Sequence, residues 1–283
     1  MVVVTGTKRS GTSLWMQILI HGGLEHIGEA FPHKWSESIV EANPKGFYES
    51  RLRTGIFYAT NPDPRTGAYL RHQDTKKHAV KVFIPGVVRT EIAYLHRVVA
   101  TLRDWRSYSR SIDALYAKED AWLFDNPGDG RTGEQAVASA QAKRPGVPAP
   151  IEWFLENYDL VRDFAVRRYP ISFVSYDTLL TDPEPVVSRV LEWVGQGNVR
   201  AAMDAIDPEL RRSQQREAVA SEAVVDPAAE RVFDDFYDAI HSGGRLPRTL
   251  LPELNELWTR LQKEFGGLSR ERGRSEDEAA EAP

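Results

Sequence analysis

The sequence predicts an α/β fold, with a central parallel sheet covered by helices and a helical C-terminal part. Short apolar runs rich in β-branched residues alternate with longer stretches whose apolar residues recur at helical spacing, as in parallel sheets that helices cover. A glycine-rich, basic turn directly follows the first apolar run, where many α/β proteins hold a phosphate. Beyond about residue 197 the apolar spacing is helical.

Four strands are expected from the apolar runs at Val2–Thr5, Ala79–Ile84, Val98–Leu102 and Ile171–Val174. Each is short and largely apolar along its length, as expected of strands buried on both faces. The helical spacing predicts helices at Thr12–His21, Tyr108–Lys118, Ile151–Arg168, Pro183–Val194, Ala228–Ile240 and Pro252–Phe265.

Residues 1–268 are expected to form a single domain. Within it, residues 125–150 are rich in Gly, Pro and Ala and have no apolar periodicity, which predicts a long surface loop or lid. The acidic tail, residues 269–283, contains almost no apolar residues and is expected to be disordered.

Composition excludes several classes of protein. The 283 residues carry a net charge of −5, so nucleic acid is not an expected partner. Cysteine is absent, which rules out disulfides, thiolate metal ligands and a cysteine nucleophile. No apolar run approaches the roughly 18 residues of a membrane span, and no secretory leader precedes the first strand. A cytoplasmic location is therefore expected.

The turn after the first strand has the features of a phosphate-binding loop. Gly6 and Gly11 permit tight backbone angles that point N–H groups into one concavity, next to the N-terminus of a helix. Lys8 and Arg9 add charge, and hydroxyl donors are available from Ser10, Thr12 and Ser13. The loop follows the Walker pattern at both glycines and at Ser13, but Thr12 occupies the position of the Walker lysine. The alternative is a basic turn that only connects strand and helix.

This loop resembles the 5′-phosphosulfate-binding loop of sulfotransferases, which use 3′-phosphoadenosine 5′-phosphosulfate (PAPS) as sulfuryl donor. Arg9-Ser10-Gly11-Thr12 matches the Arg-Ser-Gly-Thr form of the family loop, with Lys8 where proline often stands. The resemblance implies a P-loop-like sulfotransferase architecture. It also implies nucleotide-binding roles for Lys8, Arg9, Ser10, Gly11, Thr12 and Ser13.

A second segment resembles the same family. Arg103 ends the apolar run Val98–Leu102, and Ser111 follows eight residues later on an expected helix. In sulfotransferases an arginine and a serine so placed bind the 3′-phosphate, and a guanidinium fork with a hydroxyl suits that dianion. Arg106 is a possible further cation. The resemblance also makes Tyr176 the candidate for contact with the adenine. Arg211 and Arg212 either contact the nucleotide in place of a family loop that is not visible here or belong to a plain surface helix.

The resemblance implies sulfuryl transfer to a hydroxyl or amine without a metal, with Lys8 and Arg9 neutralising the leaving phosphate. The general base is an open question, because Phe83 stands where cytosolic sulfotransferases place histidine. Other members use a glutamate in a Gly-Glu stretch, which favours Glu29 here as the base; His33 and Glu49 are rivals. A carboxylate in a desolvated pocket has a raised pKa and can act near neutrality.

Lys81, at the end of a strand, is a further catalytic candidate that would contact the sulfonate, or else a lysine at the edge of the core. The acceptor is expected to be a small molecule, lipid or carbohydrate; its pocket would be lined by aromatic residues from the set Phe31, Trp35, Phe57 and Phe83. Two other functions stay open: a P-loop kinase or nucleotide phosphotransferase, and a non-catalytic nucleotide-binding protein. The first would require a Walker lysine and a magnesium site.

Overall fold

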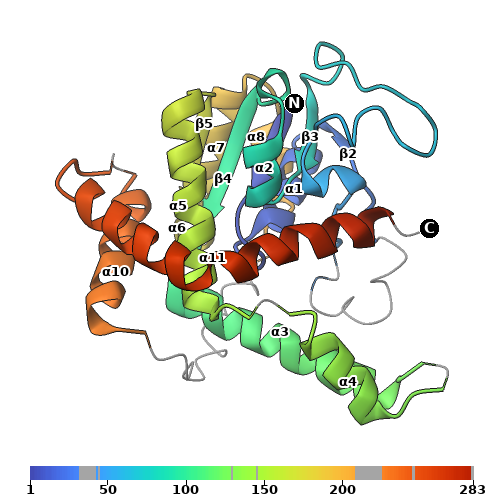
Figure 1. Ribbon diagram of the computed structural model, residues 1–283. Helices are drawn as coiled ribbons and strands as arrows, with labels where there is room; N and C mark the ends of the chain where they lie inside the picture. Colours follow the sequence, from blue (N-terminus) through green and yellow to red (C-terminus); the bar gives the residue numbers. More distant parts are fainter. Residues whose placement is uncertain are drawn as a thin grey trace.

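The computed structural model describes residues 1–31, 43, 45–128, 130–144, 146–207, 225–243 and 246–281, with side chains described as far as residue 266. Its centre is a five-stranded sheet in which every strand pairing is parallel. The strands are β1 (Val2–Thr5), β2 (Glu25–Ile27), β3 (His78–Lys81), β4 (Arg97–Leu102) and β5 (Ile171–Ser175). The expected α/β class is therefore confirmed (Figure 1).

The strand order is β2-β3-β1-β4-β5, so the chain leaves the central strand β1 toward one edge and later crosses to the other side. Because β1 lies between β3 and β4, the crossovers on its two sides run in opposite directions. Open α/β sheets bind ligands outside the carboxyl ends of the strands at such a switch point. The loop after β1 occupies that position.

Alternation along β1 explains how helices cover both faces of the sheet. Val2 and Val4 pack with helices α1 (Thr12–His21), α7 (Pro183–Val194) and α8 (Val199–Met203). The intervening Val3 packs on the opposite face against residues of α2 (Ile84–Arg89) and α5 (Ala149–Arg167), which Figure 1 shows in front of the sheet. Successive side chains of a strand point to opposite faces, so the three valines of β1 contribute to two cores.

The remaining helices are α3 (Trp105–Asp125), α4 (Gly133–Gln141), α6 (Tyr176–Thr181), α10 (Pro227–His241) and α11 (Leu251–Glu281), with 3-10 turns at Arg51–Thr54 and Ile92–Tyr94. The expected helices over Thr12–His21 and Pro183–Val194 are confirmed at both ends. Residues from α3, α5, α10 and α11 form a third core cluster, which makes the C-terminal part helical as expected.

The expected strand Ala79–Ile84 is too long at its carboxyl end. β3 ends at Lys81, and although the Val82 amide still bonds the Val4 carbonyl (3.0 Å), helix α2 begins at Ile84. The helix has Pro85 in its first turn, where proline costs no hydrogen bond and presets the helical angle. The Ile-Pro pair therefore starts a helix rather than prolonging the strand.

Residues 125–150, expected to be an irregular loop, contain helix α4. Thr132 caps its first turn by accepting from the Gln135 amide, while the Gln135 side chain accepts from the Thr132 amide (3.0 Å). This reciprocal pair is a capping box. Figure 1 shows α4 at the outer end of α3, at the edge of the molecule.

Helix α11 extends to Glu281, so the backbone is helical through most of the segment from Ser269 for which the composition predicts disorder. Figure 1 shows α11 crossing the front of the molecule. None of the helices in the described part of the chain combines the length and the apolar character needed to cross a membrane.

Candidate functional site

The predicted site residues lie along one edge of the sheet. Each strand has at least one of them at or just beyond its carboxyl end: the loop 6–11 after β1, Glu29 after β2, Lys81 ending β3, Arg103 after β4 and Tyr176 after β5. Because all five strands are parallel, segments far apart in the sequence meet at this edge.

The loop after β1 is a tight, mostly buried turn. Ser10 is fully buried, and both its amide and its hydroxyl bond the Thr7 carbonyl (3.2 and 2.7 Å). Three residues of the loop have positive φ: Gly6 with 156°, Arg9 with 66° and Gly11 with 95°. Arg9 is the only one of the three that is not glycine. A non-glycine residue rarely adopts this conformation, and where it does the strain commonly marks a functional site. Lys8 and Arg9 keep their side chains partly exposed.

Arg9 joins the first loop to the second predicted segment. Its Nε lies 3.2 Å from Oγ of Ser111, a buried residue in the second turn of α3. Its carbonyl accepts a hydrogen bond from Nη1 of Arg103 (3.3 Å). The two segments, about ninety residues apart in the sequence, therefore bring two guanidinium groups and a hydroxyl to one place, which is the donor set that a phosphate monoester requires.

Tyr176 completes this group from the end of β5. Its ring covers Gly11 so closely that a Cβ on Gly11 would lie 2.3 Å from Cδ2 of the ring. The guanidinium carbon of Arg103 lies 5.3 Å from the same ring centroid, within the range of a cation–π contact. Tyr176 is partly exposed at this edge of the sheet.

Lys81 occupies a different part of the edge. Its ammonium is buried and donates to Oγ of Ser13 (3.2 Å), the Phe47 carbonyl (2.9 Å) and Oε1 of Glu49 (2.8 Å). Glu49 is also buried, and its second oxygen accepts from Arg53 (3.2 Å). Burial lowers the pKa of Lys81, although attraction to Glu49 opposes this effect. Through Ser13, this buried ion pair is connected to the start of α1.

The two glutamates proposed as bases have different surroundings. The Glu29 side chain is exposed, and its backbone forms an isolated antiparallel bridge with Glu49. The exposed position does not supply the desolvated pocket expected from the sequence. Glu49 is buried and held between Lys81 and Arg53, so both of its carboxylate oxygens already have a cationic partner. His33, the third candidate, lies outside the described residues.

The other expected site residues are divided between the site and its surroundings. Phe83 lies 5.7 Å from the Lys81 ammonium, whereas Phe57 packs against Arg89 and Phe31 is exposed. Arg106 forms an ion pair with Asp234 of α10 (3.1 Å from Nη2 to Oδ2), so its charge is already paired with a carboxylate. Trp35, Arg211 and Arg212 lie outside the described residues.

Three residues that the sequence did not suggest hold the site in place. The Trp153 indole donates to the Arg103 carbonyl (2.9 Å), Thr101 Oγ1 donates to the Ser10 carbonyl (2.8 Å), and Asp177 accepts from the Asp104 amide (3.2 Å). Trp153 and Asp177 are 50 and 73 residues away from their partners. No local sequence signal identifies such contacts.

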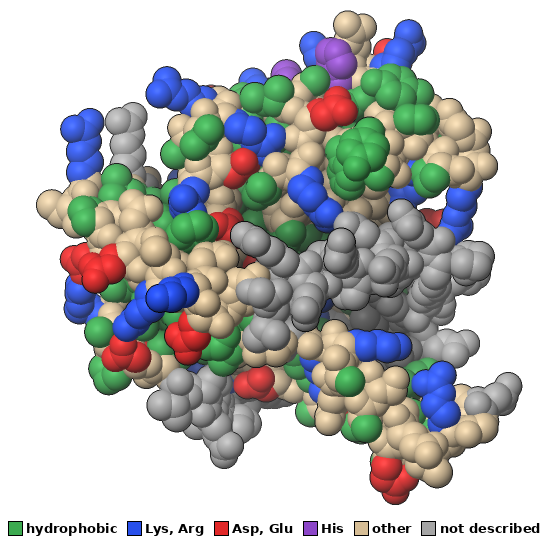
Figure 2. All heavy atoms as spheres, viewed as in Figure 1, with side chains coloured by type: hydrophobic (Ala, Val, Ile, Leu, Met, Phe, Trp, Pro, Cys, Tyr) green, Lys and Arg blue, Asp and Glu red, His purple; other side chains and the backbone are tan. Residues whose placement is uncertain are grey.

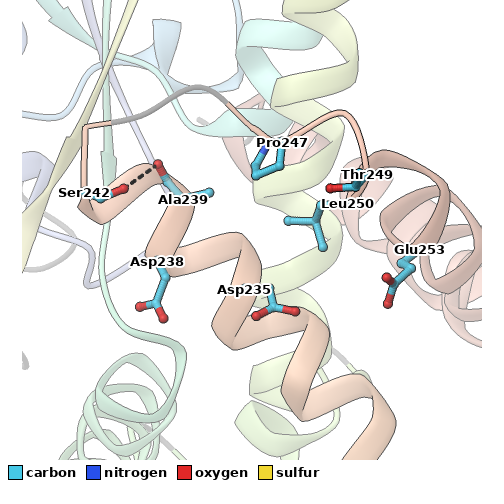
Figure 3. Close-up of a pocket in the computed structure, with 8 residues that line it drawn as sticks. All are labelled: Asp235, Asp238, Ala239, Ser242, Pro247, Thr249, Leu250 and Glu253. Atoms are coloured by element: carbon cyan, nitrogen blue, oxygen red, sulfur yellow. Dashed lines mark hydrogen bonds between the residues drawn. The ribbon is translucent and has the colours of Figure 1, made fainter.

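A separate depression lies between α10 and the start of α11, with a volume of about 480 Å³. Asp235, Asp238 and Glu253 are among its lining residues (Figure 3), and Arg231 forms ion pairs with two of them, Asp235 and Glu253. It includes none of the predicted site residues. Within the described part of the chain, no group of three or more His, Asp or Glu side chains is arranged to hold a metal ion.

The face of the molecule in Figure 2 has a mixed surface, with Lys and Arg side chains interspersed with Asp and Glu. The described cations on this face do not form the continuous basic surface that nucleic-acid backbones require.

The chain matches no protein-family model, and no curated protein sequence matches it. A function for it must therefore be argued from its own residues.

Proposed function

We propose that this chain is a sulfotransferase that transfers a sulfuryl group from PAPS to a hydroxyl or amine of a small-molecule, lipid or carbohydrate acceptor. The single observation that carries the proposal is the meeting of Arg9, Arg103 and Ser111 beside the ring of Tyr176. A nucleotide with phosphates at both the 5′ and the 3′ position needs two anion sites flanking a base-stacking surface, and these residues supply the second site and the surface.

The loop after β1 is the proposed site for the 5′ end. Its N–H groups and the N-terminus of α1 favour an anion, and Lys8 adds a charge next to Arg9. Thr12 in place of the Walker lysine argues against a triphosphate, since that lysine normally contacts the β- and γ-phosphates. Arg103 and Ser111 would hold the 3′-phosphate, with Tyr176 against the adenine.

Transfer requires cations at the leaving phosphate and a base for the acceptor. We assign Lys8 and Arg9 to the cationic role. Lys81 supports the start of α1 through Ser13 (3.2 Å), because its ammonium hydrogens are already donated to three protein acceptors. Glu29 remains the proposed base, and its exposed position leaves it accessible to an acceptor. The nearby Glu49 is the comparison residue, because its carboxylate is already paired with two cations.

The test is calorimetric titration with adenosine 3′,5′-bisphosphate without metal, beside adenosine 5′-phosphate and ATP with Mg²⁺. Micromolar or tighter binding of the bisphosphate, weakened when the 3′-phosphate is absent, is the expected result. A preference for Mg-ATP would favour a kinase or phosphotransferase. Bisphosphate binding without turnover of any acceptor supplied with PAPS would favour a non-catalytic nucleotide-binding protein.

Arg103→Ala should weaken bisphosphate binding by about 1.5–3 kcal/mol, since a charged hydrogen bond is lost. Binding of adenosine 5′-phosphate should change much less. In the same assay with PAPS and an acceptor, Glu29→Gln should retain binding and lower the rate about 10²–10⁴-fold. Equal rates for Glu29→Gln and the unaltered protein would remove Glu29 from the role of base.

A further inference from the structure

One carboxylate connects the two strand ends that carry Arg103 and Tyr176. Asp177 directly follows Tyr176 after β5, and its Oδ2 accepts a hydrogen bond from the Asp104 amide, directly after Arg103 (3.2 Å). Arg103 and Tyr176, the residues directly before Asp104 and Asp177, are also in contact: the Arg103 guanidinium lies over the Tyr176 ring.

The same Asp177 oxygen accepts a second hydrogen bond, from the hydroxyl of Tyr237 on α10. Tyr237 is buried, and burial together with the negative charge of Asp177 raises the pKa of its hydroxyl, so the hydroxyl stays protonated and donates. Its oxygen also lies 3.3 Å from Oγ of the buried Ser175 at the end of β5. A helix from the C-terminal part thus reaches the carboxyl edge of the sheet.

We infer that Asp177, held by Tyr237, is a positioning residue that fixes Arg103 and Tyr176 as one unit for recognition of the nucleotide 3′-phosphate. Asp177 and Tyr237 do not touch the proposed ligand. Asp177 acts through the backbone after Arg103 and through its neighbour Tyr176. The inference rests on the proposed function. It adds that α10, about 130 residues beyond Arg103, controls the affinity of the 3′-phosphate site.

The experiment compares Tyr237→Phe and Asp177→Asn with the unaltered full chain. The readout is the ratio of the Kd for adenosine 5′-phosphate to the Kd for adenosine 3′,5′-bisphosphate, measured well below the melting temperature of each variant. We expect each substitution to lower this ratio about fivefold to tenfold while the Kd for adenosine 5′-phosphate stays nearly constant.

The matched control is Tyr169→Phe. Tyr169 is another buried tyrosine that donates to a carboxylate, Oδ2 of Asp163 at 2.9 Å, but it precedes β5 and so lies at the opposite end of the sheet. Its loss should lower the melting temperature and leave the ratio unchanged.

If Tyr237→Phe and Asp177→Asn behave like this control, the link is only structural and the inference is overturned while the proposed function stands. If the unaltered chain fails to prefer the bisphosphate, the proposed function and the inference are both overturned. A lower ratio in Tyr237→Phe supports the whole inference. A lower ratio in Asp177→Asn with an unchanged ratio in a folded Tyr237→Phe supports Asp177 as the positioning residue and overturns the control by α10.

Discussion

At the scale of single residues, Gly11 is the position where backbone and neighbouring ring leave no space for a side chain. Its φ is 95°, and an added Cβ would lie 2.3 Å from the Tyr176 ring. Gly11→Ala should therefore cost about 1–3 kcal/mol in backbone strain and should also displace Tyr176. We expect loss of measurable bisphosphate binding in calorimetry, together with a lower free energy of unfolding.

Gly23→Ala separates these two effects. Gly23 has nearly the same φ, 98°, but no atom lies within 4 Å of an added Cβ. The Gly23→Ala variant should be destabilised by a similar backbone strain and should bind the bisphosphate normally. Normal binding by Gly11→Ala would show that the position of the Tyr176 ring does not matter for the nucleotide.

The Lys81–Glu49 pair gives a second prediction at this scale. Both side chains are buried and 2.8 Å apart, and removing one partner of such a pair typically costs about 3–5 kcal/mol because the other charge is left uncompensated. The loss of stability caused by Lys81→Met should lie near the lower limit of this range, since Arg53 still pairs with Glu49. Denaturant unfolding should show that Lys81→Met with Glu49→Leu costs clearly less than the sum of the single substitutions.

The exposed pair of Arg71 and Asp74, also 2.8 Å apart, is the comparison. Because solvent screens it, Arg71→Met should change stability by less than about 1 kcal/mol. Additive effects of Lys81→Met and Glu49→Leu would mean that burial adds nothing to the coupling between these charges.

Part of the candidate site could be predicted from single residues. Glycines, cations and hydroxyls in one short turn predict an anion-binding loop, and an arginine that ends an apolar strand falls on the same edge of a parallel sheet. The bond between Arg9 and Ser111 could not be predicted, because side-chain direction depends on how β1 and α3 pack. The exposure of Glu29 and the burial of Glu49 could not be predicted either, because each depends on which distant segments pack around the side chain.

At the scale of elements, long periodic segments were predictable and short ones were not. The spacing of apolar residues defined α1 and α7 at both ends. The strand β2 is only three residues long, and its Glu25 and His26 are exposed, so it carries no apolar pattern. Helix α4 was missed because it buries little, yet Thr132 and Gln135 form the Thr-x-x-Gln signature of a capping box, which could have revealed it.

That capping box gives a prediction for α4. Thr132→Ala removes the side-chain acceptor at the first turn and should cost about 1 kcal/mol. Because α4 lies at the outer end of α3 (Figure 1), the loss should appear as faster hydrogen exchange in α4 with little change in the global transition. Asn198→Ala, which removes the cap of α8, should speed exchange in α8 and leave α4 unchanged. Unaltered exchange in α4 of the Thr132 variant would mean that packing, not the cap, holds this helix.

At the scale of the whole molecule, a polar contact joins α11 to α5. The Trp258 indole donates to Oδ1 of Asp159 (2.7 Å), and the guanidinium of Arg162 lies 3.4 Å from the centroid of the Trp258 ring. Burial raises the pKa of Asp159, although the bond from Trp258 and the charge of Arg162 oppose the rise. The contact that joins two distant helices therefore contains a carboxylate that is destabilised when it ionises.

The pH dependence of stability follows from this contact. The pKa of Asp159 is higher in the folded than in the unfolded chain. Between these two pKa values the folded chain binds a proton that the unfolded chain has lost. The contribution of Asp159 to stability is therefore fully present below the unfolded pKa and is lost as pH rises through the folded pKa. Asp159→Asn still accepts from Trp258 but cannot ionise. Its melting temperature should match the unaltered protein at acidic pH and exceed it near neutrality, by about 2–4 °C for each kcal/mol recovered.

Trp258→Phe removes a hydrogen bond that opposes the rise in the pKa of Asp159. It should therefore make stability fall more steeply with pH in scanning calorimetry. A constant difference between Asp159→Asn and the unaltered protein across this pH range would show that the ionisation of Asp159 does not limit the docking of α11.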